Sequence, residues 1–146
     1  MTHEEYVKKV NELESQLMDV TNEFIETNKK YSVGDYLRVS FLRYDKLIQV
    51  TCKIMNIYPD DTHVPFSYYK NHPKGKLQYF ARQVWRATEI EQKNRMGFLK
   101  PDENGIFYGD RQCDLGPLSG SNLVCGYANI DWKYVTIEII TESEIL

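Results

Sequence analysis

The sequence predicts an α+β protein, in which an N-terminal amphipathic helix precedes a mostly antiparallel barrel or sandwich of about six strands. Three observations support this fold class. Apolar residues in 1–30 recur in steps of four and three, as on one face of a helix. Residues 31–58 alternate between apolar and polar side chains, as in a β-hairpin, and 77–86 and 132–140 are further strand-like segments. A length of 146 residues fits one domain, 1–146.

The first predicted element is the helix over 1–30. Thr2 followed by Glu5 fits a capping box at its start. Its apolar stripe consists of Tyr6, Val10, Leu13, Leu17, Val20 and Phe24. Three further residues widen this face: Val7, Met18 and Ile25. A coiled coil needs about three to four heptads and this stripe is shorter, so we expect the helix to pack on the chain's own sheet. Self-association through the stripe is the alternative.

The hairpin follows between Tyr31 and Tyr58. Gly34 and Asp35 are a turn pair, because glycine adopts positive φ and aspartate bonds its own backbone. A four-residue loop is predicted at 43–46. The side chains predicted to point into the core are Leu37, Val39, Phe41, Ile48, Val50, Cys52 and Ile54.

The remaining strands are predicted at 65–69, 77–86 and 132–140. Residues 77–86 carry apolar groups on both faces, which is typical of a strand covered on both sides, either a central strand or one under the helix. In 132–140 we expect three side chains to point inward: Val135, Ile137 and Ile139.

Residues 87–131 form an irregular insertion in this scheme. Thr88 and Glu91 fit the start of a short helix that ends near Gly97. Asn104 and Gly105 are a strong turn signal, and 106–108 would be the strand that follows. Long irregular connections of this kind are either functional or additions to a smaller core.

The stretch Lys30–Val39, KYSVGDYLRV, resembles the opening of small SH3-like barrels. In those barrels an aromatic-x-Val-Gly-Asp turn leads into the first strand of a hairpin. The helix-then-barrel order also resembles uncharacterised bacterial and phage-type proteins. This resemblance covers the helix and the hairpin, and it implies a binding barrel rather than a catalytic activity.

Composition and cysteine usage favour a cytoplasmic protein. The net charge is −3, and no apolar run approaches the roughly 20 residues of a membrane-spanning helix. The N-terminus lacks the pattern of a secretory signal. The three cysteines, Cys52, Cys113 and Cys125, are an odd number without paired spacing, which argues against a disulfide framework and for a reducing compartment.

The sequence predicts no metal site, cofactor or catalytic machinery. None of the cysteines and histidines (His3, His63, His72) has the paired spacing of a zinc site. The candidate nucleophile–base pairs combine Cys113 or Cys125 with His63 or His72, but no local pattern marks either thiol as activated. We therefore do not expect an enzyme.

Charge is distributed unevenly along the chain. Residues 62–100 carry a net charge of +6, whereas 101–146 carry −6. Candidate binding residues in the basic segment are Tyr68, Tyr69, Lys74, Lys76, Arg82 and Arg86. Cations and aromatic rings on a β scaffold suit single-stranded nucleic acid or a phosphorylated or nucleotide ligand. We favour the other interpretation, in which the basic segment pairs with the acidic C-terminal third and the aromatic residues belong to the core.

The function expected from these observations is a non-catalytic binding or assembly module, whose partner is another protein or a second copy of the chain. The alternative is a binder of nucleic acid or a phosphorylated ligand through the 62–100 face.

Overall fold

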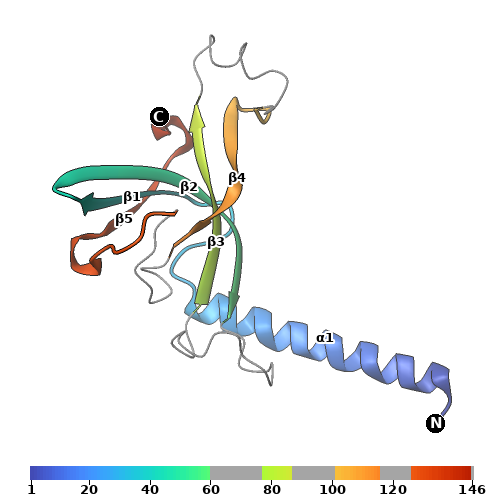
Figure 1. The fold of residues 1–146 in the computed structure, drawn as a ribbon. Helices are drawn as coiled ribbons and strands as arrows, with labels where there is room; N and C mark the ends of the chain where they lie inside the picture. Colours follow the sequence, from blue (N-terminus) through green and yellow to red (C-terminus); the bar gives the residue numbers. More distant parts are fainter. Residues whose placement is uncertain (60–76, 87–100, 116–125, 146) are drawn as a thin grey trace.

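The computed structural model describes residues 1–59, 77–86, 101–115 and 126–145. It contains one long helix and one antiparallel sheet, so the predicted α+β class is confirmed (Figure 1). Its elements are α1 (His3–Asn28), β1 (Tyr36–Arg43), β2 (Lys46–Pro59), β3 (Leu77–Arg86), β4 (Ile106–Asp114), the 3-10 turn η1 (Trp132–Tyr134), β5 (Thr136–Ile140) and the 3-10 turn η2 (Glu142–Glu144).

Within the described ranges the sheet is open and has five strands in the order β4-β3-β2-β1-β5. Among the described residues β4 and β5 are its two edges, so of the two expected architectures, barrel or sandwich, the barrel is not closed. The long strand β2 explains the shape, because Lys46–Lys53 pairs with β1 and Cys52–Pro59 pairs with β3. A register shift between Ile54 and Asn56 interrupts the second pairing, and such bulges bend a strand. The two halves of the sheet therefore run in different directions (Figure 1).

The predicted hairpin is confirmed as β1 and β2. Its turn is tighter than expected, because Arg43 pairs with Lys46 and only Tyr44 and Asp45 lie between them. Both turn residues have positive φ, 50° and 62°, as a type I′ turn requires. At the entry to β1, Gly34 has a φ of 92°, and the Asp35 carboxylate accepts a hydrogen bond of 2.8 Å from the Ser32 amide.

The two faces of the sheet carry two separate apolar cores. The main core includes the predicted inward residues of the hairpin, all buried except the half-buried Ile48. The second core, on the opposite face, consists of Val84, Ile106, Ile140 and Ile145. β3 lies between β2 and β4 and contributes to both cores, so its prediction as a central strand is confirmed.

Two predicted strands have different bounds in the structure. The first three residues of 132–140 form η1 instead of strand, since the Asp131 carbonyl accepts a hydrogen bond from the Tyr134 amide. Val135, just before β5, and Ile137 within it pack against the main core as expected, but Ile139 is 60% exposed at the sheet edge. The strand predicted at 106–108 continues to Asp114. The strand predicted at 65–69 and the helix predicted from Thr88 to Gly97 lie outside the described residues.

Candidate functional site

Helix α1 is the most exposed element that the structure describes. It has 26 residues and no buried side chain, and it projects away from the sheet (Figure 1). One half of the predicted capping box is present, because the Thr2 hydroxyl accepts a hydrogen bond of 3.1 Å from the Glu5 amide. The expectation that α1 packs along the chain's own sheet is therefore wrong for most of its length.

Among the described contacts, only the C-terminal end of α1 packs against the sheet. Ile25 is half-buried against the main core. Just after the helix, the Lys30 amide donates a hydrogen bond of 2.9 Å to the Tyr79 hydroxyl of β3. The Tyr79 ring also meets Tyr31 edge to face, with 5.8 Å between ring centroids. These contacts fix the base of the helix and leave its remaining turns without a partner among the described residues.

The predicted stripe of α1 lies along this exposed length. The exposed fraction of its side chains runs from 37% at Phe24 to 64% at Leu13 and Val20, and Val10 is half-buried. The neighbouring Val7 and Met18 are exposed too. A continuous apolar surface of this kind marks an interaction site more often than chance exposure of single residues does.

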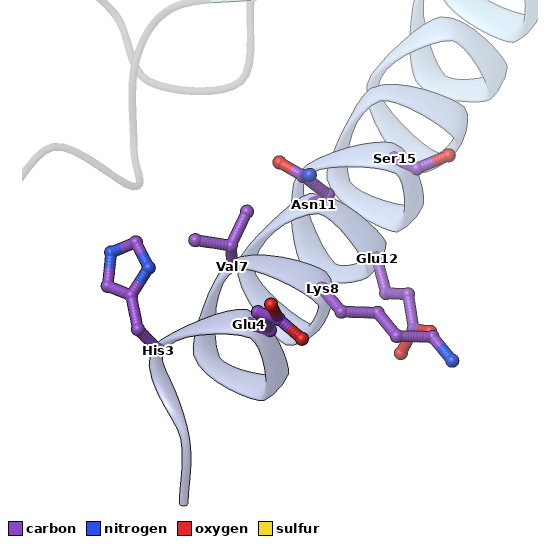
Figure 2. A pocket seen from close by; sticks show the side chains of 7 residues that line it. All are labelled: His3, Glu4, Val7, Lys8, Asn11, Glu12 and Ser15. Atoms are coloured by element: carbon purple, nitrogen blue, oxygen red, sulfur yellow. The ribbon is translucent and has the colours of Figure 1, made fainter.

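A pocket on α1, largely away from the stripe, is a feature of the helix surface and not a ligand cavity. Its lining residues are His3, Glu4, Val7, Lys8, Asn11, Glu12 and Ser15. All seven project from one element, the first turns of α1 (Figure 2). No other described element encloses the space, so it offers no site in which a small molecule would be buried.

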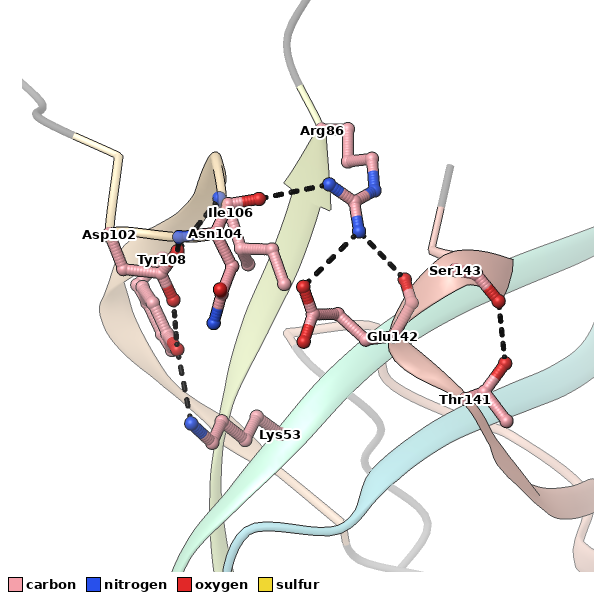
Figure 3. A network of polar contacts seen from close by, with 9 residues as sticks. All are labelled: Lys53, Arg86, Asp102, Asn104, Ile106, Tyr108, Thr141, Glu142 and Ser143. Atoms are coloured by element: carbon pink, nitrogen blue, oxygen red, sulfur yellow. Dashed lines mark hydrogen bonds and ion pairs between the residues drawn. The ribbon is translucent and has the colours of Figure 1, made fainter.

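A polar network on the sheet joins β2, β4 and the turn before β4 (Figure 3). Lys53 Nζ donates to the Tyr108 hydroxyl at 3.1 Å, and that hydroxyl donates to Asp102 Oδ2 at 2.9 Å. Asp102 Oδ1 accepts hydrogen bonds from the amides of Asn104 at 2.8 Å and Ile106 at 3.0 Å.

The ionisation of this network suits a structural role. The hydrogen bond to Tyr108 is the main factor that raises the pKa of Lys53. Partial burial, assisted by Asp102 and opposed by Lys53, raises the pKa of Tyr108. Partial burial alone would raise the pKa of Asp102, but the hydrogen bonds from Ile106, Tyr108 and Asn104 outweigh it and lower the pKa. Each pKa therefore moves away from neutrality, whereas general acid–base catalysis needs a group that titrates near the working pH.

The described part of the basic segment is occupied by internal contacts. Arg82 donates to the Gly109 carbonyl at 3.0 Å. Arg86 donates to the carbonyls of Asn104 at 3.0 Å and Glu142 at 3.1 Å, and its guanidinium lies 3.5 Å from the Glu142 carboxylate (Figure 3). Arg86 thus pairs with the acidic C-terminal third, in the manner that we favoured from the sequence.

The other four candidate binding residues of the basic segment lie outside the described residues: Tyr68, Tyr69, Lys74 and Lys76. Binding of nucleic acid or a phosphorylated ligand through this segment stays a prediction.

The cysteines differ from expectation in one respect. Cys52 is free and fully buried, and burial raises the pKa of its thiol to about 12, so it acts as a small apolar side chain. Cys113 is disulfide-bonded, although the cysteine number and spacing argued against disulfides. Because disulfides persist in oxidising compartments, the cysteines no longer support a cytoplasmic location.

Among the described residues, no three His, Cys, Asp or Glu side chains gather in a way that would hold a metal ion. The described part of the chain contains no helix that is long and apolar enough to span a membrane.

Comparison with protein-family models, with curated proteins and with solved structures finds no match to this chain.

The sequence analysis did not predict the network around Asp102. The local signal was present: an aspartate two residues before Asn104-Gly105 is placed to cap the turn with its carboxylate. The bond from Tyr108 depends on how β4 leaves the turn, and the contact with Lys53 depends on strands distant in sequence. No local pattern contains that information.

Proposed function

We propose that this protein is a non-catalytic assembly module that associates with a second copy of itself through the stripe of α1. The observation that carries the proposal is the helix of 26 residues with no buried side chain and an apolar stripe exposed along it.

An amphipathic helix gains most of its stability by burying its apolar face, since helix propensity alone leaves even long isolated helices marginal in water. Among the described residues only the last turn of α1 has such a contact, through Ile25. The remaining stripe needs a partner surface outside the described part of the chain.

A second copy of α1 fits that requirement. The stripe repeats in steps of four and three, the spacing at which two helices interlock their side chains in a coiled coil. Because a symmetric dimer brings the same patch of both subunits together, an identical helix presents the same spacing in return.

The site chemistry agrees with a non-catalytic role. The polar network of Lys53, Tyr108 and Asp102 holds strands together, and its pKa changes oppose acid–base work at neutral pH. The resemblance of Lys30–Val39 to SH3-like domains, which are binding domains, supports the same proposal.

The test is a pair of double variants compared by sedimentation velocity. Leu13→Glu with Leu17→Glu places charge in the stripe, so we expect a shift from dimer or higher oligomer to monomer. Ser15→Glu with Asn22→Glu is the matched control, because it adds the same charge to exposed positions on the opposite face of α1 and should keep the wild-type mass. Tryptophan fluorescence confirms that the sheet stays folded in each variant. A wild-type chain that sediments as a monomer throughout the micromolar range would contradict the proposal.

A further inference from the structure

We propose that two copies of α1 pair in parallel and in register, and that Lys9 of one copy and Glu14 of the other select this orientation. The inference rests on the proposed function, because it specifies the geometry of the same self-association.

The spacing of the stripe fixes a heptad assignment. Val10, Leu17 and Phe24 occupy the a positions, and Tyr6, Leu13 and Val20 occupy the d positions. The e and g positions flank these, and their side chains face the partner helix at the rim of the contact. Lys9 is then a g residue, and Glu14 is the e residue of the next heptad.

In a parallel dimer each g residue lies beside the e residue of the following heptad on the partner. Lys9 therefore meets the partner's Glu14, and symmetry forms this opposite-charge pair twice. The next two g–e pairs are Gln16 with Thr21 and Glu23 with Asn28, so neither brings like charges together. Lys9 and Glu14 are exposed, and neither forms an ion pair with another described residue.

An antiparallel dimer is less favourable on charge. The arrangement that overlays the whole stripe places Tyr6 opposite Phe24 and Leu13 opposite Leu17 of the partner. In this arrangement the g positions of one helix face the g positions of the other, and the e positions face the e positions. Lys9 then lies opposite the partner's Glu23, but Glu14 lies opposite the partner's Glu14 at the centre of the dimer. Like charges placed across an interface disfavour the arrangement that contains them.

Charge exchange tests the orientation. In the parallel dimer Lys9→Glu alone gives two Glu–Glu contacts, and Glu14→Lys alone gives two Lys–Lys contacts. We expect each single variant to raise the dissociation constant about tenfold, since exposed pairs contribute roughly 0.2–1 kcal/mol each and both pairs change sign. The double variant restores both pairs in reversed order and should return to near the wild-type value, and the two single variants should prefer each other when mixed.

The antiparallel arrangement predicts a different series. There Lys9→Glu faces Glu23, and adding Glu14→Lys does not remove that repulsion, so the double variant would remain as weak as Lys9→Glu alone. That result would overturn the inference while leaving self-association, and thus the proposed function, intact. A monomeric wild-type chain would instead overturn both.

Cross-linking gives an independent measurement. Cysteines introduced by Val10→Cys lie in the same layer of a parallel dimer, within the short Cα separation that a disulfide needs. In the antiparallel arrangement position 10 lies opposite position 20, which separates the two cysteines by about 15 Å along the axis. We expect rapid formation of a covalent dimer on a non-reducing gel, with the wild-type chain as the control for its own cysteines. Absence of the cross-link in a dimeric Val10→Cys variant would contradict a parallel pairing.

Discussion

Asp102 shows how much one side chain contributes where a turn meets the sheet. Its two carboxylate oxygens accept hydrogen bonds from two backbone amides and from the Tyr108 hydroxyl. The same turn is held from the other side by Arg86, which donates to the Asn104 carbonyl. Asp102 therefore links the start of β4 to Lys53 of β2 through Tyr108.

Replacing Asp102 by asparagine should destabilise the protein by roughly 1–2 kcal/mol at neutral pH, because hydrogen bonds to a charged acceptor are lost or weakened. The stability difference should depend on pH. The pKa of Asp102 is lowered from 3.8 in the folded protein, so the carboxylate's contribution is complete well above pH 3.8. It should then decline as the pH falls through the lower folded-state pKa. Urea unfolding of both proteins across this acidic range measures the difference.

Glu103→Gln is the matched control for this experiment. It removes the same charge at the next position, where the side chain is exposed, so we expect a change within about 0.5 kcal/mol at every pH. Equal effects of the two substitutions would show that the Asp102 network adds no stability.

At the scale of single elements, the β1–β2 turn lies where the sequence predicted a loop, but its two central residues are of types that rarely adopt positive φ. Tyr44 and Asp45 both have positive φ, which glycine and asparagine adopt more readily. The alternating pattern of the strands and the main core behind them impose this turn on the two residues.

The turn leads to a prediction with opposite outcomes at one position. Asp45→Gly should preserve or increase stability, since glycine adopts a φ of 62° without steric cost. Asp45→Val should destabilise by about 1–2 kcal/mol, because a β-branched side chain is strained there. Thermal unfolding of the two variants beside the wild type measures both effects. If valine is tolerated as well as glycine, the left-handed turn is not present in solution.

Elements were predictable where a local pattern coincides with a buried face. The hairpin strands alternate strictly, and their inward residues are the main core. β4 alternates less clearly, because Gly109 and the polar residues after it interrupt the apolar pattern, so its last six residues were missed. Trp132 and Tyr134 are of types enriched in strands, but the hydrogen bond from the Tyr134 amide to the Asp131 carbonyl produces a 3-10 turn.

Helix α1 illustrates the limit of amphipathicity as a signal. The stripe shows that one face is suited to burial, and the helix was predicted correctly on that basis. Periodicity contains no information on what buries the face. Only the position of the helix relative to the sheet distinguishes the chain's own core from a partner.

At the scale of the whole molecule, closure of the sheet could not be predicted from the sequence. Closure depends on whether the edge strands β4 and β5 pair with each other, and β3, β2 and β1 lie between them in the sheet. The bend along β2 directs the two halves of the sheet apart, so β4 and β5 do not pair with each other. A turn motif such as Val33-Gly34-Asp35 specifies only a local entry into a strand.

The division between helix and sheet predicts two thermal transitions. α1 contacts the sheet through its last turn, so its helicity should depend on association and melt at a temperature that rises with protein concentration. The sheet has its own cores and should melt at a temperature independent of concentration. Circular dichroism of the helix and tryptophan fluorescence of the sheet region over a range of concentrations separate the two transitions. A single transition that is unaffected by dilution would contradict this division.

The attachment of α1 at Ile25 and Lys30 has a consequence for geometry beyond the helix itself. A helix of 26 residues is about 39 Å long, and its base is fixed to the sheet while its tip is far from it. In the proposed parallel pair, both sheets lie at the same end of this rod. Two identical sheet surfaces would then face a target together, so a surface with weak affinity as a single copy would bind a repetitive target with the avidity of two linked sites.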